Sequence, residues 1–111
     1  MATQHAVAGE LVDLATWGDE LPTEHSKVIA KTAGLELAKL VLQAGTEMHH
    51  SDYCHVKGPV VIHCLEGEIK VRTRDTVENL INGQLVFLDG EMDHALTSVK
   101  KSTVLLTIVL I

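Results

Sequence analysis

Histidine and cysteine are concentrated in one short part of this chain. Four of its seven histidines and both of its cysteines lie between residues 47 and 67, and a fifth histidine, His94, follows later. The side chains in the stretch are His49, His50, Cys54, His55, His63 and Cys64. Imidazole and thiolate are the groups that bind transition metals at neutral pH. The sequence therefore predicts a metal or ligand site built from this stretch and from His94.

A turn and a strand divide the histidine stretch. Gly58 and Pro59 are typical turn residues, and the β-branched residues from Val60 onward predict a strand over 60–65. Successive side chains of a strand point to opposite faces, so Val60, Ile62 and Cys64 share one face and His63 lies on the other.

Short apolar stretches separated by turn residues run through the rest of the chain. They predict strands at 11–14, 28–30, 35–43, 68–74, 77–81, 85–88, 95–99 and 104–111. The stretch 35–43 also fits an amphipathic helix, but Gly34 and Gly45 at its ends favour a strand buried on both faces. Many short strands at this spacing indicate an all-β sandwich or barrel. We expect the strand over 104–111 to be central in a sheet or covered by a second subunit, because an exposed apolar edge strand promotes aggregation.

The composition bounds the architecture and the partners. A chain of 111 residues, 46% of them hydrophobic, is enough for one domain with a core. The net charge of −6 without a cluster of basic residues excludes nucleic acid and anionic membranes as partners. Aromatic residues make up only 3% of the chain, which argues against sugar or base recognition by stacking.

The cellular location is predicted from two sequence signals. The first residues have neither the basic start nor the apolar run of a signal peptide, and the longest apolar run is too short for a membrane-spanning helix. We predict a cytoplasmic protein. Cys54 and Cys64 lie close enough in sequence to pair, but free thiols in a reducing compartment are the favoured interpretation.

Residues 83–98 resemble the second motif of the cupin superfamily, G-x5-P-x-G-x2-H-x3-N. Gly83 and His94 have the spacing of that motif. Asp89 stands in place of its proline, Glu91 in place of its second glycine and Ser98 in place of its asparagine.

The first cupin motif, G-x5-H-x-H-x3/4-E-x6-G, is matched less well. Registered from its last glycine, Gly67, its second histidine falls on His55, its first on Tyr53 and its metal-binding glutamate on Val60. Valine cannot bind a metal. His49 or His50, just upstream, can take the place of the missing metal ligand.

The resemblance implies an all-β fold, the double-stranded β-helix or cupin jelly-roll barrel, over residues 28–111. Residues 1–27 are then an N-terminal arm with a short strand and a loop. It also implies one cavity, with the side chains of Tyr53, Val60, Ile62 and Cys64 lining it and His63 pointing away, into a sheet or subunit contact. A metal site would consist of His55, His94 and either His49 or His50, with Cys64 as a further candidate ligand.

The function that the resemblance implies is small-molecule binding at this site. A divalent Zn, Fe, Ni or Mn ion would support dioxygenase or isomerase chemistry, and no metal binds if Val60 has abolished the site. The alternatives are a metal-free binding or sensing module and a structural or assembly domain, so the sequence leaves open whether the protein is an enzyme. Glu91 and Asp93 either orient the ring of His94 or are surface charges, the reading we favour for Asp93. A homodimer is expected, because association covers apolar edge strands.

Overall fold

A computed structural model of the protein describes residues 5–18, 26–48 and 57–111. The predictions for His49, His50, Tyr53 and His55 lie outside these residues. The described residues form nine strands and no helix. The strands are β1 (Ser26–Lys31), β2 (Leu35–Leu42), β3 (Glu47–Met48), β4 (Val60–Glu66), β5 (Glu68–Thr73), β6 (Val77–Ile81), β7 (Gln84–Leu88), β8 (His94–Ser98) and β9 (Ser102–Val109).

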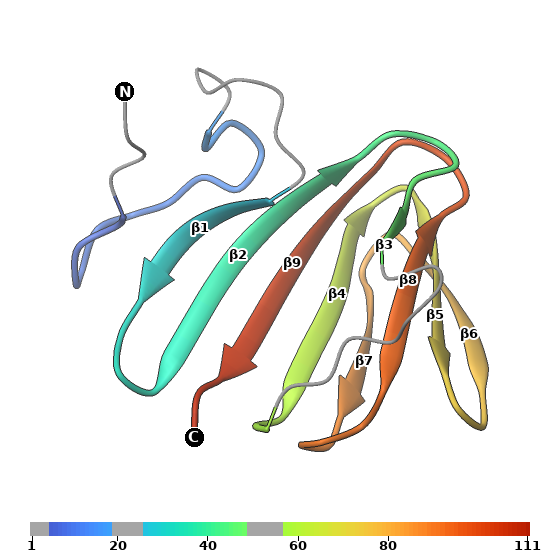
Figure 1. Ribbon diagram of the computed structural model, residues 1–111. Coiled ribbons are helices and arrows are strands. Elements are labelled where there is room, and N and C mark those ends of the chain that lie inside the picture. The colour runs from blue at the N-terminus through green and yellow to red at the C-terminus, as the bar shows by residue number, and fades with distance from the viewer. Residues whose placement is uncertain (1–4, 19–25, 49–56) are drawn as a thin grey trace.

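The strands form two antiparallel sheets (Figure 1). One sheet has the order β1-β2-β9-β4-β7 and the other has the order β3-β8-β5-β6. The inward side chains of both sheets make one apolar core: Leu40, Leu42, Val60, Ile62, Cys64, Ile69, Val71, Leu80, Leu88, Leu96 and Val104. The two-sheet, all-β arrangement confirms the predicted jelly-roll fold. Within the described residues, no helix is long and apolar enough to cross a membrane.

Two predicted strands behave as the sequence indicates. The stretch at 35–43 is the strand β2, and the consecutive residues Ala38, Lys39 and Leu40 are all buried. Both faces of β2 are therefore covered, which explains why its residues do not alternate between apolar and polar. The stretch at 104–111 is β9, which pairs with β2 on one side and β4 on the other, so its apolar side chains lie in the centre of the sheet.

The predicted strand at 11–14 is wrong. Residues 11–13 have no regular structure, and a turn begins at Leu14. The side chain of Asp13 accepts a hydrogen bond from the Ala15 amide at 3.0 Å, and the Asp13 carbonyl accepts one from the Trp17 amide at 2.8 Å. An aspartate that bonds to the backbone two residues on closes a turn, and this local bonding prevails over the apolar pattern.

Candidate functional site

The side chain of His94 lies at the beginning of β8 and is 8% exposed. It shares the inner face of its strand with Leu96 of the core, and it is in register with Thr73 of β5. A histidine is therefore placed inside the barrel, at the end of the apolar core. This is the histidine that the second cupin motif singles out.

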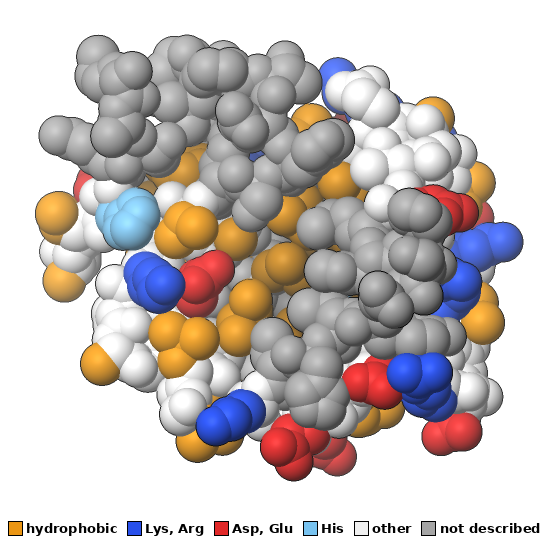
Figure 2. Space-filling model, in the orientation of Figure 1, with side chains coloured by type: hydrophobic (Ala, Val, Ile, Leu, Met, Phe, Trp, Pro, Cys, Tyr) orange, Lys and Arg blue, Asp and Glu red, His pale blue; other side chains and the backbone are white. Residues whose placement is uncertain are grey.

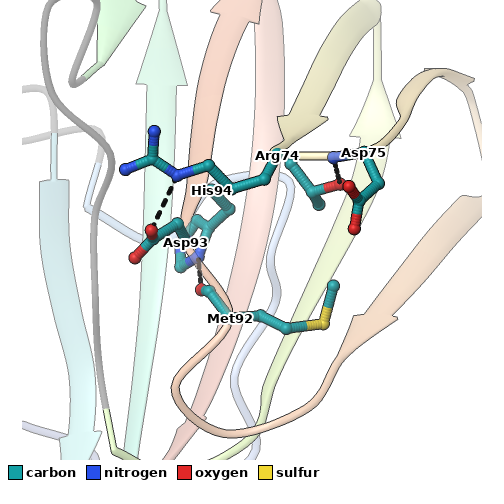
Figure 3. Close-up of polar contacts among 6 residues, drawn as sticks. Arg74, Asp75, Met92, Asp93 and His94 are labelled. Carbon is teal, nitrogen blue, oxygen red and sulfur yellow. Dashed lines mark hydrogen bonds and ion pairs between the residues drawn. The ribbon is translucent and has the colours of Figure 1, made fainter.

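A backbone hydrogen bond fixes the tautomer of His94 (Figure 3). The ring atom Nδ1 lies 3.1 Å from the carbonyl oxygen of Met92. A carbonyl oxygen only accepts hydrogen bonds, so Nδ1 carries the hydrogen. In the neutral ring the lone pair is then on Nε2. Metal-binding histidines are commonly held in this way, with the second ring nitrogen donating to a carbonyl or carboxylate.

The carboxylate next to His94 has a different partner. Asp93, just before β8, accepts a hydrogen bond from Nε of Arg74, just after β5, at 2.8 Å, and the two groups form an ion pair (Figure 3). Glu91 is exposed, in the turn before β8. The described partner of the His94 Nδ1 atom is thus the backbone carbonyl of Met92. The sequence did not predict this bond, because no side-chain pattern indicates which carbonyl a ring nitrogen will meet.

From Val60 to Cys64, the strand β4 turns alternate residues inward. Val60, Ile62 and Cys64 are at most 3% exposed and belong to the core, whereas Val61 and His63 are half-buried on the opposite face. The position where the cupin motif has its glutamate is therefore an apolar wall. Burial raises the pKa of the Cys64 thiol, so this side chain is a neutral, free thiol in the core.

Half-buried hydrophobic side chains extend this apolar wall. Val86, Leu106 and Ile108 pack against the core from β7 and β9 without being fully buried. Figure 2 shows hydrophobic side chains gathered in the middle of the face seen in Figure 1, over β2 and β9. The interior near His94 is apolar, and a polar ligand group has few described partners there besides this imidazole.

Ser98 anchors the turn that leads toward the histidine stretch. Its hydroxyl donates to the Gln43 carbonyl and accepts from the Thr46 amide at 3.2 Å. Its backbone also bonds to Gly45 and Thr46. Ser98 is 1% exposed and occupies the position of the motif asparagine. The resemblance marked this position, but only the structure shows that it holds residues 43–46 against β8.

The described residues do not complete a metal site. They bring together no group of three His, Cys, Asp or Glu side chains that could hold a metal ion. Among the candidate ligands, His94 and Cys64 are described and both face inward. The roles of His49, His50, His55 and Tyr53 remain predictions, because these residues lie outside the described part of the chain.

Comparisons with known proteins identify the fold. No protein-family model and no curated protein matches the chain. Its structure is similar to that of a cupin superfamily protein from Desulfitobacterium hafniense, with a TM-score of 0.72 and 14% identity, over 78% of this chain and 76% of that chain. It is also similar to a conserved protein of unknown function from Streptococcus pyogenes, with a TM-score of 0.76 and 19% identity, over 100% of this chain and 98% of that chain.

An enzyme is among the similar structures. Salicylate 1,2-dioxygenase from Pseudoaminobacter salicylatoxidans matches with a TM-score of 0.62 and 18% identity, over 69% of this chain but only 21% of the enzyme. The protein therefore has the cupin fold, a small double-stranded β-helix. At these identities the likeness shows the fold alone, because this fold carries many different activities.

Proposed function

We propose that the protein binds a small molecule in its barrel at a divalent metal site built on histidines. The observation that carries the proposal is the buried imidazole of His94, whose Nδ1–H is held by the Met92 carbonyl. This bond leaves Nε2 as the ring atom able to bind a metal or to accept a hydrogen bond. The set is completed by His55 and by His49 or His50.

The charge of the ligand set indicates the class of small molecule. Three neutral histidines leave the charge of a divalent ion uncompensated, whereas a set that includes a glutamate would offset part of it. Val60, 3% exposed in the core, stands where that carboxylate would be. Such a site favours a small anionic ligand, such as a carboxylate, whose apolar part can contact the half-buried side chains of β9. The metal would supply Lewis-acid or oxygen chemistry, and the fold similarity to a dioxygenase makes oxygen-dependent chemistry the first to assay.

Metal content tests the proposal directly. We expect about one Zn, Fe, Ni or Mn ion per chain in the purified protein, measured by elemental analysis. The variant with both His94→Gln and His55→Gln should lose it, while the matched variants His63→Gln and His5→Gln should keep it. His63 lies on the outer face of β4 and His5 is exposed, so both control for the loss of a histidine alone. Unchanged stoichiometry in the double variant would contradict the proposal.

A metal-free binding module is the second candidate, and the apolar wall at Val60, Ile62 and Cys64 favours it. In that case Nε2 of His94 accepts a hydrogen bond from a mainly apolar ligand. The two candidates differ in their response to chelation. Stabilisation by a ligand against thermal unfolding survives chelator treatment if the site is metal-free, and disappears if the metal holds the ligand.

A further inference from the structure

A groove lies between the turn at residues 14–18 and the outer side of the larger sheet. It consists of two adjoining hollows of about 310 Å³ and about 370 Å³. Ala15, Lys39, Glu66 and Thr103 line both hollows, and Lys101 lines the second. We call this the arm groove. Its volume is at the lower end of the range for small-molecule sites, which begins at roughly 300 Å³.

The arm groove is separate from the interior of the barrel. In β2, Lys39 alternates with Leu40 of the core, and in β9, Thr103 alternates with Val104 of the core. Successive side chains of a strand point to opposite faces, so Lys39 and Thr103 point away from the core. The larger sheet therefore lies between the groove and His94, which is inside the barrel.

Lys39 brings a buried positive charge to the groove. The residue is 4% exposed, and its Nζ donates a hydrogen bond to the Trp17 carbonyl at 3.0 Å. An ammonium group has three N–H donors, and this carbonyl is the one partner that the described residues give it. Taking a charge out of water is unfavourable unless an opposite charge or further hydrogen bonds compensate for it. The ammonium group therefore favours an anion beside it.

A β-bulge places a carboxylate on the other side of the groove. The register of β4 against β9 shifts between Cys64 and Glu66. Glu66 is then opposite Thr103, with Leu65 as the extra residue. Regular alternation would turn Glu66 to the same face as Cys64, into the core. Instead Glu66 is exposed and lines the groove next to Leu65, as is typical of a bulge, which changes the direction of a side chain.

Opposite charges thus line the groove from two different strands. The strands β2 and β4 flank β9, so Lys39 and Glu66 are two strand spacings apart, about 10 Å. Neither of the ion pairs found among the described residues joins them. Thr103 of β9 lies between them and has a hydroxyl that both donates and accepts. Apolar side chains complete the lining: Leu14, Ala15, Val41 and Leu65.

We propose that the arm groove binds a small zwitterion of the amino-acid type with an apolar side chain. Its carboxylate accepts a hydrogen bond from the ammonium group of Lys39, and its own ammonium group donates to Glu66. A simple anion would compensate Lys39 but would face the carboxylate of Glu66, and a simple cation would face Lys39. Charge-assisted hydrogen bonds of this kind are stronger than neutral ones. Lys101, which is exposed, adds a second positive charge that favours the carboxylate end of the ligand.

Titration of the isotope-labelled full chain with L-leucine, followed by NMR, tests this site. The amide signals of Ala15, Val41 and Thr103 should shift and saturate, with a Kd on the order of 1 mM. Two matched compounds each lack one charged group of leucine. Isocaproate lacks the ammonium group and isoamylamine lacks the carboxylate. Each should bind at least about tenfold more weakly than L-leucine, because one charged side chain of the groove is left without a partner.

Four variants assign the two ends of the ligand. Lys39→Met keeps an unbranched side chain and should weaken L-leucine binding at least about tenfold, because it removes a buried charge. Glu66→Gln, at an exposed position, should weaken it by about threefold and should strengthen isocaproate binding, because two carboxylates no longer face each other. Lys70→Met and Glu78→Gln, at exposed positions of the other sheet, should leave both affinities unchanged. Circular dichroism checks that all four are folded, and Glu66→Gln tests the site even if Lys39→Met does not fold.

Three results would overturn the proposal. The first is the absence of shifts at the groove amides with L-leucine up to roughly 100 mM. The second is isocaproate binding as tightly as L-leucine does. The third is loss of L-leucine binding in the double variant with His94→Gln and His55→Gln, which would place the ligand at the proposed metal site. The metal content of Lys39→Met should equal that of the wild type, so this proposal and the proposed function can fail separately.

Discussion

Replacing Glu91 with glycine should stabilise the protein. Glu91 has a φ of 64°, and it is the one non-glycine residue with a positive φ among the described residues. The left-handed conformation costs an L-residue about 1–2 kcal/mol. Glycine avoids this cost but loses more backbone freedom on folding, by about 0.5–1 kcal/mol. The net gain is about 0.5–1 kcal/mol, or roughly 2–4 °C in Tm for a chain of this size.

Two further variants separate the backbone effect from the loss of a side chain. Glu91→Ala keeps a Cβ atom and should give no comparable gain. Asp89→Gly changes an exposed residue of the same turn whose φ is not positive, so it should destabilise the protein by about 0.5–1 kcal/mol. Urea unfolding followed by circular dichroism measures all three. If Glu91→Gly destabilises the protein as much as Asp89→Gly does, the left-handed turn is not a source of strain and the reasoning is wrong.

Two other predictions concern buried side chains. Ser98→Ala should lower the unfolding free energy by about 0.5–1.5 kcal/mol in the same urea assay. The Gln43 carbonyl and the Thr46 amide each lose the Ser98 hydroxyl as a partner but still bond to each other at 3.1 Å; an unchanged midpoint would contradict this role. Burial raises the pKa of the Cys64 thiol above its ordinary value of 9.0, so in a Cys54→Ser background a thiol reagent at pH 8 should react only after unfolding. The folded state then holds this proton more tightly than the unfolded state, so the contribution of Cys64 to stability falls as the pH rises above about 9.

The sequence predicts most strands because their signals are local. In β5 the alternation of Ile69 and Val71 with Lys70 and Arg72 matches the observed burial. The wrong prediction at 11–14 has a local cause too, since one hydrogen bond from the Ala15 amide to the Asp13 side chain closes a turn that apolar patterning does not reveal. Strand propensity describes the local preference of a segment. Here the hydrogen bond between a side chain and the backbone produced a turn instead of a strand.

The site was harder to predict because its contacts are not local. The sequence pointed to His94, but not to the Met92 carbonyl that orients it or to the pairing of Asp93 with Arg74, which lies nineteen residues away in sequence. The hydrogen bonds of Ser98 to Gln43 and Thr46 join residues more than fifty positions apart. Such contacts depend on the register of β8 against its neighbours, and a single residue of slip would exchange its inward and outward faces.

The alternate residues of β4 belong to different surfaces. Val60 and Ile62 contribute to the apolar wall of the barrel, while Val61 and His63 lie on the outer side of the larger sheet. Substitutions within β4 therefore affect both surfaces through one backbone and cannot tell them apart. Phe87 of β7 and His94 of β8 lie in different sheets, and each belongs to only one of the two surfaces. Phe87→Lys, at an exposed position, should therefore leave the metal content measured by elemental analysis unchanged, whereas His94→Gln should lower it. A Phe87→Lys variant that folds but loses its metal would contradict this separation of the two surfaces.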